Sequence, residues 1–260
     1  MILTGQNQPT LDTGEIDRFA RLADKWWDPE GEFRPLHKLG PARLAFLRSH
    51  LVRHFNREEH AAKPLTGLTI LDVGCGGGLI SEPLARLGAI VTGIDPAEEN
   101  IAVAIQHAEP QGLAIHYRAC RVEELVAEHA QFDAIVCLEV VEHVPDPQAF
   151  ITTCAEVLRP GGLFILSTIN RTLKSYALAI VGAEYILRWL PIGTHQWDRF
   201  ITPEELSRYC ISAGLQQPTF EGLIYNPLTG RWTLGADTDV NYMAAAAKPA
   251  GDSSEAKRPQ

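Results

Sequence analysis

The spacing of hydrophobic positions changes near residue 68 of this chain. Before it, apolar side chains recur every three or four residues in two stretches, 16–27 and 42–55, as they do along one side of a helix. After it, short apolar runs typical of strands alternate with helical stretches as far as residue 169. Strands and helices that alternate at this spacing predict βαβ units and a parallel sheet.

The pattern places individual elements. Strands are expected at 68–74, 89–95, 114–119, 132–139 and 163–169, with two more near 218–225 and 240–246. Helices are expected at 79–87, 98–107, 122–128, 148–158 and 202–213. We therefore predict an α/β domain with a seven-stranded, mostly parallel sheet, an antiparallel last strand, helices on both faces and an N-terminal helical cap.

Shifts in composition predict the domain boundaries. Residues 1–14 are polar and are expected to be a disordered N-terminus, and residues 15–63 form the helical cap. The α/β domain then spans 64–247 and carries an apolar insertion at 172–197. The polar residues 248–260 predict a disordered tail.

Composition and charge narrow the function. The 260 residues include 23 Lys and Arg against 32 Asp and Glu, a net charge of −9 that argues against a general nucleic-acid binder. The five cysteines form no C-x-x-C pair, which favours the reduced thiols of a cytoplasmic protein over a zinc or disulfide framework. The first residues do not resemble a secretory signal, and no apolar run is long enough to span a bilayer.

The most informative local feature is a glycine-rich stretch, DVGCGGG (72–78), between an expected strand and an expected helix. Glycines there let the backbone approach a ligand closely, at the strand end where open α/β sheets bind ligands. The dinucleotide fingerprint G-x-G-x-x-G/A, begun at Gly74, fails because Leu79 occupies its last position. The G-x-G-x-G pattern instead suits an adenosine with an amino-acid tail. S-adenosylmethionine is therefore the predicted cofactor, with Asp95, at the end of the next strand, accepting from its ribose hydroxyls.

A second cluster follows the fourth expected strand, beside the predicted cofactor. Glu139, Glu142 and His143 are close enough in sequence to converge on one ion or one proton. They could hold Mg²⁺, which would favour the anion of a phenol and orient it. Alternatively, His143 is a general base assisted by Glu142, because an imidazole titrates near neutral pH. A third interpretation is that Glu142 and His143 only shape the loop.

Longer motifs extend from residue 25 to residue 243. They are KWWDPEGEFRPLH (25–37), LDVGCGGG (71–78), EHVPDP (142–147), RPGG (159–162), STINR (167–171), VGAEYILR (181–188), GTH (193–195), YNP (225–227) and DVNYM (239–243). Together they resemble the bacterial ubiquinone biosynthesis O-methyltransferase family, a branch of the class I S-adenosylmethionine-dependent methyltransferases with a Rossmann-like fold. Two departures are small: Leu138 stands where a methionine can occur, and Lys25 replaces an arginine.

The resemblance implies an activity and a set of site residues. The activity is methyl transfer from S-adenosylmethionine to phenolic oxygens of 2-polyprenyl-6-hydroxyphenol and 3-demethylubiquinol, both O-methylation steps. The implied cofactor contacts are Arg43, Gly74, Asp95 and Leu138, and Arg43 suits the methionine carboxylate. The implied metal positions are Glu139, Glu142 and His143, with Mg²⁺ as a candidate second cofactor. We expect Asp72 to lie beneath the glycine loop and orient either the loop or the methionine ammonium.

An apolar segment, Lys174–Leu190, is too short and too charged to span a bilayer. Either it is a buried helix, or it is a lid that lies on the membrane and admits a polyprenyl tail, which we favour because the implied substrate is lipid-tailed. Trp26 and Trp27 line the same entrance or pack in the core. The expected partners are the lipid-tailed substrate, the membrane surface and, as a candidate, a ubiquinone biosynthetic complex, with no nucleic acid. The expected location is the cytoplasm, with a peripheral position on the inner face of the membrane.

Three other functions remain open from the sequence. A nicotinamide dehydrogenase with the same class of sheet is disfavoured by Leu79, and a cofactor-binding titration separates it. A methyltransferase that acts on another small phenolic or lipid-tailed molecule is separated by product analysis. A non-catalytic lipid-binding module would bind vesicles without turning over the cofactor.

Overall fold

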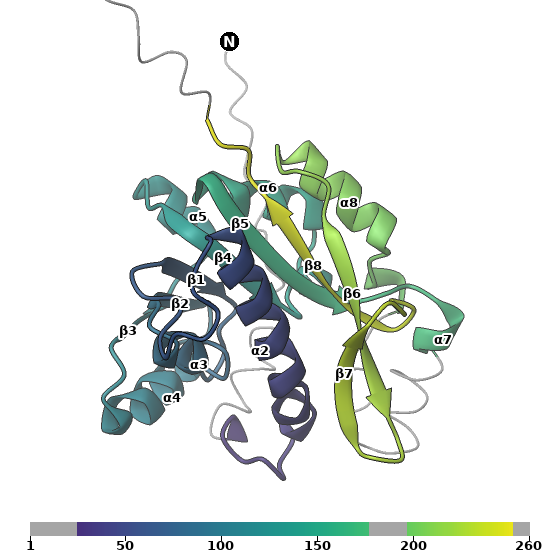
Figure 1. The fold of residues 1–260 in the computed structure, drawn as a ribbon, viewed down its shortest axis with the longest axis horizontal. Coiled ribbons are helices and arrows are strands. Elements are labelled where there is room, and N and C mark those ends of the chain that lie inside the picture. Colours follow the sequence, from purple (N-terminus) through teal and green to yellow (C-terminus); the bar gives the residue numbers. More distant parts are fainter. Residues whose placement is uncertain (1–24, 177–196, 252–260) are drawn as a thin grey trace, which may run out of the picture.

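A computed structural model describes residues 25–176 and 197–251 of the chain. Its centre is one sheet with the strand order β3-β2-β1-β4-β5-β8-β6-β7 (Figure 1). The strands are β1 (Thr69–Val73), β2 (Ile90–Asp95), β3 (Ile115–Ala119), β4 (Phe132–Leu138), β5 (Leu158–Ile169), β6 (Thr219–Asn226), β7 (Arg231–Gly235) and β8 (Asn241–Ala247). Strands β1 to β5 are parallel, and β8, β6 and β7 extend the sheet with antiparallel pairs.

The connections between the parallel strands are helical, as expected. The helices are α2 (Arg34–His54), α3 (Ser81–Arg86), α4 (Glu98–Ala108), α5 (Val122–Ala127), α6 (Pro147–Glu156), α7 (Leu173–Ser175) and α8 (Pro203–Ser212). Short 3-10 helices are η2 (Glu109–Gln111), η3 (Val141–His143) and η5 (Trp197–Arg199). Within the described residues, no helix is both long enough and apolar enough to cross a bilayer.

Successive residues of β1 belong to two different cores. Ile70 packs with α2 and α3 on one face of the sheet, which Figure 1 shows crossed by α2. Leu71 packs on the other face with α5, α6 and α8. Because neighbouring strand residues point to opposite faces, apolar residues at consecutive positions, such as Ile70 and Leu71, are what a sheet covered on both sides requires.

Within residues 25–176 and 197–251 the sheet has eight strands, so the prediction of seven was wrong. The missed strand is β7, which pairs with β6 in register from Gly222↔Gly235 to Asn226↔Arg231. Its five residues are all exposed or half-buried, so they show no continuous apolar run. This strand therefore forms because it pairs with β6 across the turn at 227–230, and not because its own residues are hydrophobic.

Two element boundaries also differ from the prediction. Helix α2 begins at Arg34, earlier than the expected residue 42, and continues through Pro41. Residues 26–33 run as turns and bends, so Trp26 and Trp27 lie outside the helix that their spacing predicted. Strand β5 begins at Leu158 and includes the Arg-Pro-Gly-Gly turn, where the pairing with β4 shifts register. Proline and glycine near a strand end produce this irregularity.

The structure describes only part of the predicted terminal segments and of the predicted insertion. Residues 1–24 and 252–260 lie outside the described residues, as does the predicted lid from residue 177 to 196. Lys248, which the sequence assigned to a disordered tail, is held in place: its Nζ donates to the carbonyls of Ala155 and Leu158, each at 2.7 Å. The ordered chain therefore continues beyond residue 247.

Tyr242 is a buried polar anchor between β8 and the segment before α8. Its side chain is fully buried, and its hydroxyl donates to the Ile201 carbonyl at 2.8 Å. We expect Tyr242→Phe to lower the free energy of unfolding by about 1–3 kcal/mol, because the carbonyl loses its partner in a dry environment. Urea denaturation measures this, and an unchanged midpoint would show that the bond contributes nothing net.

Candidate cofactor and catalytic site

The sheet order places two loops side by side. β1 and β4 are neighbours, but the chain leaves β1 toward β2 and leaves β4 toward β5, on the opposite side. This reversal is the switch point at which open α/β sheets bind ligands, beyond the carboxyl ends of the strands. The glycine loop follows β1, and the acidic–histidine stretch 139–143 follows β4. The two motifs singled out in the sequence therefore meet at one edge.

The glycine loop makes close backbone contacts. A Cβ atom added to Gly74 would lie 2.4 Å from Val140 Cγ2, so a side chain there would collide with the loop that follows β4. Gly76 has a φ of +51°, a left-handed conformation that favours glycine, and its N–H donates to Asp95 Oδ2 at 3.0 Å. The loop is thus held by Val140 packed against Gly74 and by Asp95 bonded to Gly76, and both positions require glycine.

Asp95 ends β2 and lies under the loop with 7% of its surface exposed. Besides Gly76, it accepts from the Ala97 N–H at 2.9 Å and from Asn100 Nδ2 at 3.1 Å. Burial raises the pKa of the Asp95 carboxyl above its ordinary value, against these three hydrogen bonds. Sequence reasoning found Asp95 by its position but missed Asn100, which holds the carboxylate in orientation.

Asp72 lies one residue before the end of β1 and is also buried. Its Oδ2 accepts from Ser81 Oγ at 2.6 Å. Burial raises the pKa of Asp72 to about 6, opposed by the Ser81 hydrogen bond and assisted by repulsion from Asp95. Among the described residues, neither carboxylate has an ion-pair partner within 4.0 Å. Two buried carboxylates without a protein cation favour a cationic ligand.

Arg43 projects from α2 to the edge of the sheet where β4 ends, and its side chain is 5% exposed. Its Nη2 lies 2.8 Å from Glu139 Oε1. In the described structure, however, its buried Nε and Nη2 atoms reach no acceptor with hydrogen-bond geometry. We interpret the contact with Glu139 as electrostatic attraction that leaves guanidinium donors unused. Such donors suit a carboxylate ligand.

Glu139, Glu142 and His143 lie on one turn after β4, and the carboxylates have other partners. Glu139 has a left-handed φ of +56°, and its Oε1 accepts from Ser167 Oγ at 2.8 Å. Glu142 is buried and accepts from Thr168 Oγ1 at 2.9 Å. Burial raises the pKa of Glu142 to about 7, with repulsion from Glu139 adding to the rise and His143 opposing it.

These three residues do not form a metal centre in the structure. Throughout 25–176 and 197–251, no group of three His, Cys, Asp or Glu side chains is arranged to hold an ion. Arg43 lies against Glu139 and supplies positive charge where a cation would be needed. The residues as arranged therefore do not fit Mg²⁺.

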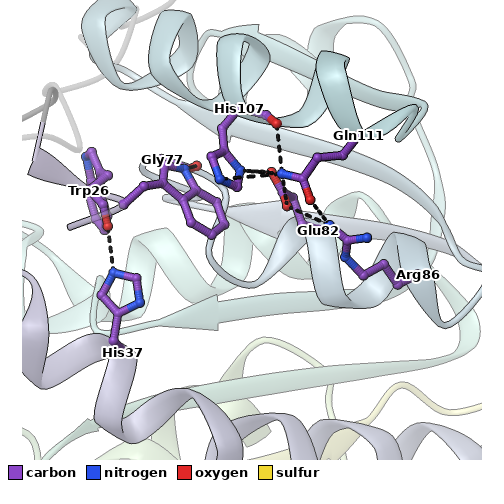
Figure 2. A network of polar contacts seen from close by, with 8 residues as sticks. Trp26, His37, Gly77, Glu82, Arg86, His107 and Gln111 are labelled. Atoms are coloured by element: carbon purple, nitrogen blue, oxygen red, sulfur yellow. Dashed lines mark hydrogen bonds and ion pairs between the residues drawn. The ribbon is translucent and has the colours of Figure 1, made fainter. Parts of the chain in front are cut away.

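The remaining predicted positions are Leu138, Trp26 and Trp27. Leu138 is the last residue of β4, half-buried, at the edge where an adenine would lie. The sequence left Trp26 and Trp27 either at the membrane entrance or in the core. In the structure Trp26 is buried and both residues pack at the glycine loop, where Trp27 Nε1 donates to the Gly77 carbonyl at 2.9 Å. Figure 2 shows the polar network there, which includes Glu82 and His107 and had no signal in the sequence.

Comparison with known proteins agrees with this arrangement. The family model described as "Methyltransferase domain" matches residues 71–166, which include the glycine loop and the 139–143 turn. A ubiquinone biosynthesis O-methyltransferase from Chelativorans sp. is 54% identical over 243 residues, covering 94% of this chain and 96% of the relative. One from Methylobacterium sp. is 53% identical, covering 93% of this chain and 97% of the relative.

Solved structures share the fold at low identity. Magnesium protoporphyrin IX methyltransferase from Synechocystis with bound S-adenosylmethionine superposes with a TM-score of 0.62 at 20% identity, covering 93% of this chain and all of that one. A methyltransferase from Thermotoga maritima superposes with a TM-score of 0.60 at 15% identity, covering 90% of this chain and 99% of that one. The fold and the glycine loop agree with the sequence identity of more than half to these relatives over nearly the whole chain. The chain therefore belongs to the ubiquinone biosynthesis O-methyltransferase family, within the class I S-adenosylmethionine-dependent methyltransferases.

Proposed function

We propose that this enzyme methylates the phenolic oxygens of 2-polyprenyl-6-hydroxyphenol and 3-demethylubiquinol, with S-adenosylmethionine as methyl donor. The observation that carries the proposal is the meeting of the glycine loop and the 139–143 turn at the switch point of the sheet. A cofactor in the first and a phenol beside the second would be in contact. The names of relatives about half identical to this chain supply the substrate class.

Each site residue has a role in this proposal. Asp95 accepts from both ribose hydroxyls, Gly74 lets the loop pack against Val140 while its backbone approaches the methionine chain, and Arg43 binds the methionine carboxylate. Leu138 packs against the adenine. These contacts aim the sulfonium methyl toward the 139–143 turn. Holding two reactants in line contributes roughly 7–11 kcal/mol in well-oriented intramolecular reactions.

His143, next to the buried Glu142, is the proposed general base. A phenol with a pKa near 10 is mostly protonated at neutral pH, so its oxygen must lose a proton to attack the methyl group. His143 is half-buried, on the turn that follows β4. The imidazole takes the phenol proton, and the oxygen displaces the sulfur of the cofactor at the methyl carbon. No step is assigned to a metal.

We further propose that the enzyme works at the cytoplasmic face of the membrane, where a polyprenyl tail resides. Both ends of the 172–197 insertion carry exposed apolar side chains: Leu173 is 83% exposed, Tyr176 47% and Trp197 38%. Large apolar and aromatic side chains at a surface favour contact with the interface of a bilayer. The insertion would then guide the tail while the head group reaches the site.

The test is transfer of labelled methyl from S-adenosylmethionine to a short-chain demethylubiquinol, with and without EDTA. We expect labelled methoxy product in equal yield in both arms, because the acidic–histidine turn does not fit a metal ion. Product that disappears with EDTA and returns with Mg²⁺ would overturn the metal-free assignment. No product while the cofactor still binds would show that the acceptor is another molecule.

A further inference from the structure

The segment that precedes α2 packs directly on the glycine loop. Trp26 is 8% exposed, and its ring stacks on Phe33 with centroids 3.9 Å apart. A Cβ atom added to Gly76 would lie 2.4 Å from the Trp26 ring, and one added to Gly77 would lie 2.5 Å from Trp26. The indole therefore fits against backbone that only glycine leaves bare. We call residues 25–33 the tryptophan cover.

The cover is also connected to the proposed ribose acceptor. Trp26 Nε1 donates to Asn100 Oδ1 at 2.8 Å, and Asn100 Nδ2 donates to Asp95 Oδ1 at 3.1 Å. The indole thus fixes the orientation of the amide, and the amide fixes the carboxylate. His37, on α2, bonds the Trp26 carbonyl at 2.8 Å and holds the backbone of the cover (Figure 2).

Trp27 makes the second attachment. Its Nε1 donates to the Gly77 carbonyl at 2.9 Å, so it holds the glycine loop directly. Its ring stacks on His107 of α4, with centroids 3.4 Å apart and planes 8° from parallel. A displacement of His107 would therefore be transmitted to the carbonyl of the loop through one rigid side chain.

His107 is itself anchored by a buried acid. Glu82, on α3, is 2% exposed, and its Oε1 lies 2.6 Å from His107 Nδ1. Its Oε2 accepts from Gln111 at 3.3 Å and from Arg86 at 3.4 Å, as Figure 2 shows. A buried carboxylate with three partners has little freedom to move. The proposed reaction uses none of these residues.

We propose that the tryptophan cover holds S-adenosylmethionine in place, and that Trp26, Trp27 and His107 are positioning residues for the cofactor loop. They act on the retention of the cofactor and not on the transfer step, since their contacts end at the glycine loop and at Asp95. The inference depends on the cofactor and is independent of which phenol is the acceptor in the proposed function.

The test is calorimetric titration with S-adenosylhomocysteine, followed by kinetics at varied S-adenosylmethionine. His107→Ala removes both the stack on Trp27 and the bond to Glu82. We expect the Kd and the KM for the cofactor to rise about 10-fold, with kcat at saturating cofactor within about twofold of the parent enzyme. Trp27→Phe removes the bond to Gly77 and keeps an aromatic ring, though a smaller one, for the stack on His107, so a smaller rise is expected.

Two controls separate positioning from general damage. His107→Gln keeps a planar group and a donor for Glu82, and it is expected to restore the Kd to within about threefold of the parent. Trp232→Phe removes an indole in β7, on the hairpin at the other end of the sheet, and is expected to leave the Kd unchanged. Titration requires no phenol, so an incorrect acceptor does not affect this test.

Several outcomes would overturn the inference. One is a Kd for S-adenosylhomocysteine that is unchanged in both His107→Ala and Trp27→Phe. Another is a fall in kcat at saturating cofactor with an unchanged KM, since that pattern reports on the transition state. If His107→Ala does not fold, Trp27→Phe decides alone, because it keeps an aromatic ring that can stack on His107 and so disturbs the packing less.

Discussion

Asp95→Ala is expected to weaken binding of S-adenosylmethionine at least about 100-fold, because the two charge-assisted hydrogen bonds proposed between Asp95 and the ribose, each worth about 1.5–3 kcal/mol, would be lost together. The substitution also leaves the Gly76 N–H and the Asn100 amide without their acceptor. The loop would then lose the shape that receives the ligand. Calorimetric titration of the free enzyme with S-adenosylhomocysteine measures the effect without requiring an acceptor.

Asp133→Ala is the matched control for Asp95→Ala. Asp133 is also a carboxylate with three partners, since it accepts from the backbone and side chain of Thr69 and from Arg159. It lies near the beginning of β4, at the end of the parallel strands opposite the glycine loop. Loss of stability with an unchanged Kd is expected for this variant. Equal loss of binding in the two variants would mean that Asp95 acts only through the fold.

Asp72→Asn is expected to make the free enzyme more stable at pH 8 and to weaken its binding of S-adenosylmethionine. The ionised carboxyl is buried, and its pKa is raised from 3.8 to about 6. A shift of this size corresponds to about 3 kcal/mol of destabilisation once the group is ionised in both states. Asparagine has no charge to bury, and its amide oxygen can still accept from Ser81.

The pH dependence follows from the direction of the shift. In the unfolded chain Asp72 ionises near its ordinary pKa, whereas in the folded protein it holds its proton to about pH 6. The unfolded state therefore loses its proton first, and the contribution of this group to stability falls as pH rises from about 4 to about 6 and stays low above that. Urea denaturation across this range should show the fall in the parent and not in Asp72→Asn.

Ser81→Ala tests the same argument in the opposite direction. It removes the hydrogen bond that lowers the pKa of Asp72, so the cost of the ionised carboxyl should increase. This variant should be less stable than the parent at pH 8 and closer to it at pH 4. A parent and an Asp72→Asn variant with identical stability at pH 8 would show that Asp72 is already neutral or solvated there.

The order of elements could be predicted because it depends on local spacing. Mostly apolar stretches such as 69–73 and 132–138 become strands covered on both faces, and the helices between them have room to cross. β7 could not be predicted, because it is a strand only through its pairing with β6. The start of α2 could not be predicted either, because the contacts of residues 25–33 with the glycine loop decide where the helix begins.

In the candidate site too, some residues could be predicted from the sequence and others could not. Gly74 and Asp95 could be found because the loop motif is contiguous and the acid ends the next strand. The link from Trp26 to Asn100 joins residues 74 positions apart, and the link from Glu82 to His107 joins residues 25 apart. Neither pair has a spacing that a helix or a strand explains. Only the arrangement of residues 25–33, α3 and α4 around the glycine loop brings these side chains together.

The position of β8 has a consequence for the order in which the protein acquires its structure during synthesis. β8 is the last strand of the described chain, yet it lies between β5 and β6 in the sheet. Until residues 241–247 leave the ribosome, the parallel strands β1 to β5 and the β6–β7 hairpin have no shared edge. The emerging chain therefore exposes the open edge of β5, a surface that pairs readily with other strands and on which chaperones act.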